Sequence, residues 1–209
     1  MEQSSIRCTL VTDGTSDHVL SFHLTWLMRQ YTRRNIPPFE YADFSHLLRR
    51  PHGLKARIRA AIEYYPCEVL FIHRDAEREP YAVRKAEIDQ ALESLTIPAV
   101  CVVPVRMQEA WLLFDEYAIR RAAGNPNGRV QLSLPPRKRL EELSDPKETL
   151  HDLLRKASER TGRGLKKFDP YKVAHLIGEF IDDFAPLRAL PAFKRLESDI
   201  QALVQAQGW

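Results

Sequence analysis

Residues 67–77, CEVLFIHRDAE, contain the strongest indication of the fold. Four apolar residues, Val69 to Ile72, stand side by side with no polar residue between them. Such a run is typical of a strand that is covered on both faces, as strands are in a parallel sheet between helices. Charged residues follow at once, from His73 to Glu77, so this strand is expected to present acids at its carboxyl end.

The segments around this strand alternate between strand-like and helical patterns. We predict strands in residues 6–11, 39–45 and 97–105, and helices in residues 18–34, 53–66, 82–95 and 108–124. Alternation with short connections predicts an α/β domain, residues 1–125, with a parallel sheet and helices on both faces.

The rest of the chain has a different character. Residues 125–139 are rich in Pro, Gly and Asn and predict a loop. Helical patterns follow in residues 145–160, 169–184 and 190–205, with residues 161–168 separating the first two. We therefore predict a helical C-terminal region, residues 126–209, packed on the α/β domain.

Composition narrows the class of protein. Hydrophobic residues make up 44% of the 209 positions and charged residues 28%, which favours a folded domain over a disordered tail. The net charge of +3 permits a nucleic-acid partner without requiring one. No apolar run approaches the roughly 20 residues of a membrane span, and the first residues lack a signal-peptide core. We expect no membrane partner and a cytoplasmic location.

Acids stand at the ends of three of the four predicted strands. Asp13 follows the first, Asp75 and Glu77 follow the third, and Glu109 comes after the fourth. Parallel strands place these ends at one edge of the sheet, where ligands of α/β proteins bind. Converging carboxylates repel one another unless a cation lies among them, and Mg²⁺ or Mn²⁺ prefers such oxygen ligands. We predict a metal site formed by Asp13, Asp75, Glu77 and Glu109.

Three further residues are candidates for binding a phosphate. Gly14 lacks a Cβ atom, so a phosphate can approach the turn after the first strand, where a helix begins. Arg74 and Arg106 lie beside the predicted acids and offer charged donors to phosphate oxygens.

Each of these residues also has a structural interpretation. Asp13-Gly14 is an ordinary turn dipeptide, and Asp17 is typical of a helix cap. His73 is more typical of a structural residue at a strand end than of a base. Glu109 suits the first turn of a helix as well as it suits a metal site.

Several segments together resemble a known family. Residues 10–17, LVTDGTSD, and residues 69–78, VLFIHRDAER, resemble the Toprim pattern of topoisomerases, primases and OLD-type nucleases. That pattern has Glu-Gly after the first strand and Asp-x-Asp after the third. The later segments VPVRMQEAWLLFD (103–115), DPKETLHDLLRKAS (145–158) and YKVAHLIGEFID (171–182) resemble a largely uncharacterised bacterial Toprim-like family with an E-A-W-L-L segment.

The resemblance implies Mg²⁺-dependent cutting of DNA or RNA, with Asp13, Asp75 and Glu77 as the catalytic residues. It also implies a phage-defence setting with an ATPase partner. The sequence contains no P-loop, so the ATPase would be another chain.

Two alternatives stay open. Asp13 is shorter than the family's Glu and Glu77 longer than its Asp, and a displacement of about 1 Å can cost on the order of 10²-fold in rate. These departures favour a catalytically decayed binding or regulatory subunit. Phosphotransfer on an aspartate, as in receiver domains, is the other alternative, although no lysine ends a later strand.

Overall fold

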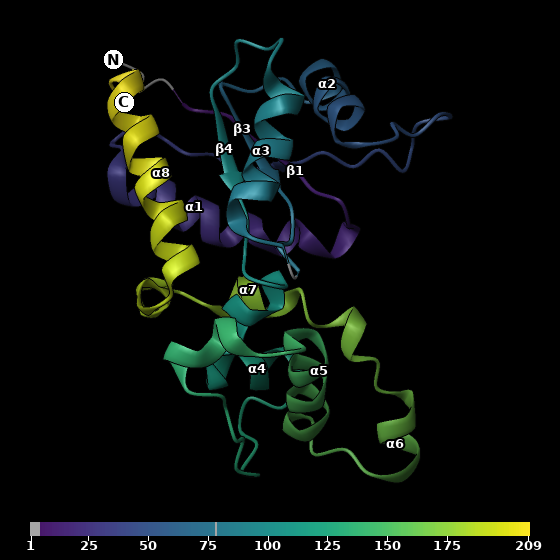
Figure 1. Cartoon of the computed structure of the whole chain (residues 1–209). Coiled ribbons are helices and arrows are strands. Elements are labelled where there is room, and N and C mark those ends of the chain that lie inside the picture. Colours follow the sequence, from purple (N-terminus) through teal and green to yellow (C-terminus); the bar gives the residue numbers. More distant parts are fainter. Residues whose placement is uncertain (1–4, 78) are drawn as a thin grey trace.

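The computed structural model describes residues 5–77 and 79–209 and confirms the predicted fold class. A parallel sheet and the helices that flank it form the upper part of Figure 1, and further helices lie below it. The first four residues, on which the expectation of no signal peptide partly depends, lie outside the described residues. None of the described helices is both long and apolar enough to span a membrane.

The sheet is parallel throughout its described strands, in the order β2-β1-β3-β4. The strands are β1 (Cys8–Val11), β2 (Glu40–Tyr41), β3 (Val69–His73) and β4 (Ala99–Val102). Val11 of β1 lies opposite Ile72 of β3, and His73 lies opposite Val102 of β4. This register carries the chain after β1 alongside the chain after β3.

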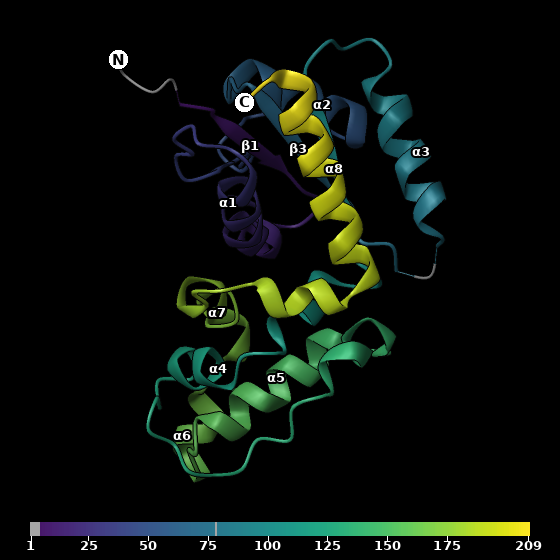
Figure 2. The same ribbon diagram turned by 90° about the vertical axis from the view of Figure 1, so that its left-hand side faces the viewer.

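Helices cover both faces of the sheet, which explains the unbroken apolar run of β3. Because side chains alternate along a strand, Phe71 packs toward α1 (Leu20–Tyr31) and α8 (Pro191–Gln207). Ile72 packs on the opposite face, in the core formed with α2 (Leu54–Tyr64) and α3 (Tyr81–Leu92). Figure 2 shows α8 running along the sheet after the chain returns from the lower helices.

The remaining elements form the lower part of the molecule, apart from η1, which leads into α1. They are η1 (Thr15–Val19), η2 (Gln108–Leu112), α4 (Glu116–Ala122), η3 (Arg137–Glu142), α5 (Pro146–Ala157), α6 (Gly162–Lys167), η4 (Pro170–Lys172), α7 (Leu176–Phe180) and η5 (Ala185–Ala189). One apolar core runs from the sheet through Trp111 of η2 into α5 and α7. The predicted C-terminal region therefore shares its core with the α/β domain.

Two helix predictions were wrong in detail. Residues 108–124 are not one helix: η2 ends before Asp115, whose carboxylate accepts a bond from Ala118 N at 2.9 Å and begins α4. Residues 169–184 are likewise divided between η4 and α7. The separating segment, residues 161–168, contains the short helix α6, whose residues are all exposed.

Candidate functional site

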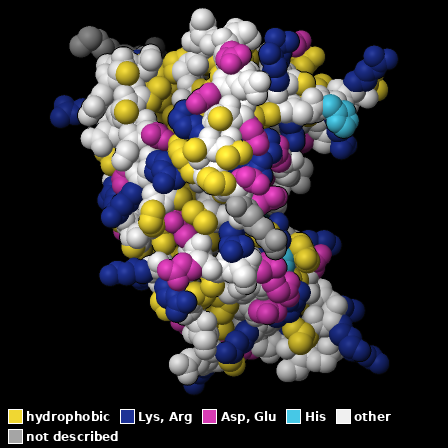
Figure 3. Space-filling view, viewed as in Figure 1, with side chains coloured by type: hydrophobic (Ala, Val, Ile, Leu, Met, Phe, Trp, Pro, Cys, Tyr) yellow, Lys and Arg dark blue, Asp and Glu magenta, His cyan; other side chains and the backbone are white. Residues whose placement is uncertain are grey.

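The strand order predicts where on the sheet a ligand would bind. From β1 the chain goes to β2 on one side and then to β3 on the other, so the connections diverge between β1 and β3. Ligands of open parallel sheets bind at such a point, beyond the carboxyl ends of the strands. Figure 3 shows acidic and basic side chains intermingled where the outline narrows between the sheet and the lower helices.

His73 is buried at this point between two acids. Its Nε2 atom lies 3.1 Å from Asp75 Oδ1, and its Nδ1 atom lies 3.4 Å from Asp17 Oδ2. The second contact is an ion pair that is not aligned as a hydrogen bond. Alternation along β3 places His73 on the face of Phe71, toward η1, which carries Asp17.

His73 is a cation in this setting. Burial by itself would lower its pKa, but the close contacts with Asp17 and Asp75 and their negative charges raise the pKa to about 9. Burial pushes the pKa of Asp17 upward, and the contact with His73 outweighs this and holds that pKa below its ordinary value. His73 is thus not a free base, because its two ring nitrogens contact two acids.

Gly14 makes room for Asp17. The Gly14 N–H donates to Asp17 Oδ2 at 3.1 Å, and a Cβ atom on Gly14 would lie 3.2 Å from the same oxygen. The sequence interpretation reserved this space for a phosphate, whereas the structure fills it with a carboxylate. Asp17, expected as a helix cap, instead lies inside η1, where its side chain bonds the backbone of the N-cap residue Gly14; it also faces the candidate site.

Glu109 and Lys147 join the same cluster from the lower part of the molecule. Lys147 Nζ lies 3.0 Å from Glu109 Oε1. Burial raises the pKa of Glu109, Lys147 opposes that rise, and the negative charge of Asp75 adds to it. The pKa of Lys147 is raised against the effect of burial, by Glu109 first and then by Asp17 and Asp75.

Lys147 was missed by sequence reasoning as a site residue. It lies on α5, far along the chain from the strands, and comes close only because α5 packs on η2. The one available signal was the segment Asp145 to Glu148, which the family resemblance singled out without giving it a role.

Asp13 also lies at the carboxyl edge of the sheet, but it pairs with arginines and not with the cluster around His73. Its Oδ2 atom lies 2.7 Å from Arg74 Nε, and its backbone oxygen accepts a bond from Arg57 at 2.9 Å. The β1–β3 register explains the first contact, because two steps beyond Val11 and Ile72 bring Asp13 opposite Arg74. The Asp13 side chain remains half exposed.

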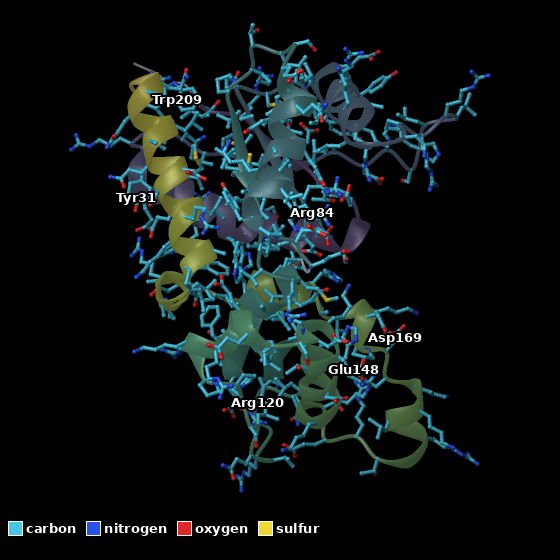
Figure 4. All side chains as sticks on the ribbon, viewed as in Figure 1. Tyr31, Arg84, Arg120, Glu148, Asp169 and Trp209 are labelled. Carbon is cyan, nitrogen blue, oxygen red and sulfur yellow. The ribbon has the colours of Figure 1, made fainter. Side chains whose placement is uncertain are left out.

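Glu77 turns away from the cluster. Glu77 and Arg106 have positive φ angles of 55° and 62°, and Glu77 N donates to Arg106 O at 3.2 Å. Left-handed backbone costs a non-glycine residue about 1–2 kcal/mol, so the chain leaves β3 and β4 through a paired strained turn. The Glu77 carboxylate, 69% exposed, lies 3.7 Å from Arg84, which Figure 4 labels on α3.

The predicted metal set does not fit a metal ion as the side chains stand. Carboxylate oxygens suit Mg²⁺ chemically. Within residues 5–77 and 79–209, however, no group of three or more His, Cys, Asp or Glu side chains is arranged to hold one. The structure brings Asp75, Glu109 and Asp17 together around His73 and Lys147, and it places Asp13 and Glu77 with arginines.

A cavity of about 300 Å³ adjoins this cluster, with Glu109 and Lys147 in its wall. Gln108 and His151, each 2% exposed, also line it. Gln108 Oε1 and His151 Nδ1 have no hydrogen-bond partner within the described part of the protein. An unsatisfied buried polar atom costs about 1–3 kcal/mol, so these two are unusual features of the wall.

Comparisons of the chain with protein-family models, with curated proteins and with solved structures give no match. The Toprim resemblance therefore stays a prediction.

Proposed function

We propose that the carboxyl edge of the sheet is the site of metal-dependent hydrolysis of nucleic-acid phosphodiesters. One observation supports this most: Asp17, Asp75 and Glu109 converge from three separate elements on His73 and Lys147, at the point where the strand connections diverge. Burying several acids together is costly, and a folding role alone is served by apolar side chains.

The residues of the chain have distinct parts in this proposal. Asp75 and Glu109 are the acids that a divalent ion would share, with Asp17 beside them. Asp13, Arg74 and Arg106 border the edge and meet the phosphodiester backbone. Since His73 and Lys147 now lie among the acids, a divalent ion competes with these two cations for the same oxygens.

A second candidate is a binding or regulatory subunit without turnover. The ion pairs favour it: Asp75, Glu109, Asp13 and Glu77 each contact a cationic side chain. An acid that is already neutralised has less need of a metal ion. In this alternative the arginines at the edge and the exposed basic helix α6 hold a polyanion.

The wider setting belongs to the same proposal. The substrate is DNA or RNA, the location is the cytoplasm, and an ATPase partner acts with the protein in phage defence. Two features support this part: the family resemblance, and a mildly basic net charge of +3 without a P-loop.

The test is a cleavage assay with the full chain. Labelled single- and double-stranded DNA and RNA are incubated with Mg²⁺ or Mn²⁺, and with EDTA instead. We expect metal-dependent cleavage that falls at least about 100-fold in Asp75→Asn. The matched control is Asp89→Asn on α3, an exposed acid paired with Lys85 at 2.6 Å, which keeps full activity.

Cleavage that persists in Asp75→Asn contradicts the assignment of this site. Absence of cleavage on all four substrates, together with tight nucleic-acid binding in EDTA, favours the second candidate.

A further inference from the structure

The cavity beside the acidic cluster has the features of a ligand pocket. It lies between η1, η2, α5 and the segment that leads into α7, and its wall includes Gln108, His151 and Tyr171. Glu109 and Lys147 belong both to this wall and to the acidic cluster. Whatever occupies the cavity is therefore next to the proposed reaction site.

Two polar atoms in the wall lack partners. Gln108 Oε1 and His151 Nδ1 are buried, and neither has a hydrogen-bond partner among residues 5–77 and 79–209. A leucine or methionine would fill the same space without this cost. These two atoms indicate a ligand that carries hydrogen-bonding groups of its own.

Aromatic rings also line the cavity, in two pairs whose rings are tilted against each other. The rings of His151 and Tyr171 are 4.1 Å apart between centroids, and those of His18 and His175 are 5.2 Å apart. All four residues line the cavity. Figure 4 labels Glu148 on α5 and Asp169 immediately before η4, the neighbouring elements that carry His151 and Tyr171.

The ligand that matches this wall is flat, aromatic and polar at its edge. A cavity of about 300 Å³ accommodates a nucleobase. Proteins that hold single bases stack them on aromatic side chains and bind their edges through amide and imidazole groups. The free acceptor Oε1 of Gln108 requires a donor, which the exocyclic amino group of adenine, cytosine or guanine supplies.

We propose that this cavity binds one amino-bearing nucleobase of the substrate and thereby places the adjoining phosphodiester against Asp75 and Glu109. This inference rests on the proposed function, since it specifies the substrate of the same site. It assigns Gln108 and His151 to binding the edge of the base, and Tyr171 to stacking on it.

Calorimetric titration in EDTA separates base binding from hydrolysis. The full chain is titrated with AMP, UMP and ribose 5-phosphate. We expect AMP to bind at least about tenfold more tightly than ribose 5-phosphate, and more tightly than UMP. Gln108→Leu weakens AMP binding about tenfold and removes the preference over UMP, whereas Gln90→Leu on the exposed side of α3 changes neither.

Equal affinities for AMP and ribose 5-phosphate overturn the inference, as does an unchanged AMP affinity in a folded Gln108→Leu protein. His151→Phe provides a second variant if Gln108→Leu does not fold, and it too weakens AMP binding. Base-selective binding without cleavage on any substrate supports the pocket and contradicts hydrolysis. Cleavage without base-selective binding supports hydrolysis at this site and contradicts the nucleobase pocket.

Discussion

The pKa values of two buried histidines are shifted in opposite directions. His23, on α1, packs among Trp111, Phe184 and Phe193, and its nitrogens lie 3.4 Å from the backbone oxygens of Val19 and Trp111. Burial lowers the pKa of His23 to about 4, while burial of His73 is outweighed by Asp17 and Asp75, which raise that pKa to about 9.

The comparison shows that burial alone does not decide the charge of a histidine. Both side chains are at most 1% exposed. The apolar core favours the neutral ring, whereas the carboxyl edge of the sheet holds enough negative charge to keep a buried ring protonated. That excess of negative charge is what makes the edge a candidate for binding cations and for chemistry.

The largest expected effect is on folding stability at neutral pH. His73→Leu leaves Asp17 and Asp75 without their shared cation and lowers the free energy of unfolding by about 3–5 kcal/mol. His23→Leu keeps an apolar side chain of similar volume in the core and costs less than about 1.5 kcal/mol. Denaturant unfolding of the two variants measures both values, and a larger loss in His23→Leu would refute the contrast.

The pH dependence of stability should run in opposite directions for the two residues. His23 has a folded pKa of about 4 against 6.5 unfolded, so its neutral form stabilises above 6.5 and this contribution is lost as pH falls toward 4. His73 has a folded pKa of about 9, so its contribution is complete below 6.5 and is lost as pH rises through 9.

Each contribution amounts to about 3 kcal/mol over its window. Unfolding free energies of the wild type and both leucine variants, measured from pH 4 to 9, test this. The wild type should lose stability relative to His23→Leu only at the acidic end, and relative to His73→Leu only at the basic end. If the unfolding free energies of all three proteins change with pH in parallel, the two histidines do not have these shifted pKa values.

A smaller effect concerns Glu109, a buried acid that pairs with the partly exposed cation Lys147. Lys147→Met removes that cation, so Glu109 takes up a proton more readily and stability at pH 7 falls by about 1 kcal/mol. The loss should shrink near pH 5 and vanish in the background of Glu109→Gln. If Lys147→Met lowers the free energy of unfolding equally in the wild type and in Glu109→Gln, Lys147 and Glu109 do not stabilise each other.

The smallest effect tests the strained exit from β4. Arg106→Gly relieves a φ angle of 62° and raises stability by about 0.5 kcal/mol, since the greater freedom of unfolded glycine offsets part of the gain. Arg129→Gly, in an exposed loop outside the positive-φ positions, serves as the control and lowers stability slightly. Equal effects in both variants would show that the turn stores no strain.

The fold could be predicted from the sequence because local patterns carry it. The run Val69 to Ile72 required cover on both faces, and the alternation of elements set the parallel topology. The register of β1 and β3 then places Asp13 opposite Arg74, where the two side chains form an ion pair.

The candidate site could be predicted only in part, for reasons of local geometry. Strand ends located Asp75, but the sequence does not show that η1 folds Asp17 back onto His73. Glu77 leaves the cluster because its backbone turns left-handed, which nothing in its residue type indicates. Lys147 arrives through helix packing distant from the strands, and such contacts leave no periodic signal.

The most direct measurement is the anomalous scattering of Mn²⁺ in crystals of the full-length protein. We predict an anomalous peak about 2 Å from carboxylate oxygens of Asp75 and Glu109. The Lys147 side chain should then be turned away from Glu109. The proposal is contradicted if crystals at high Mn²⁺ show no peak at this edge. In that case His73 would still contact Asp17 and Asp75, and Lys147 would still contact Glu109.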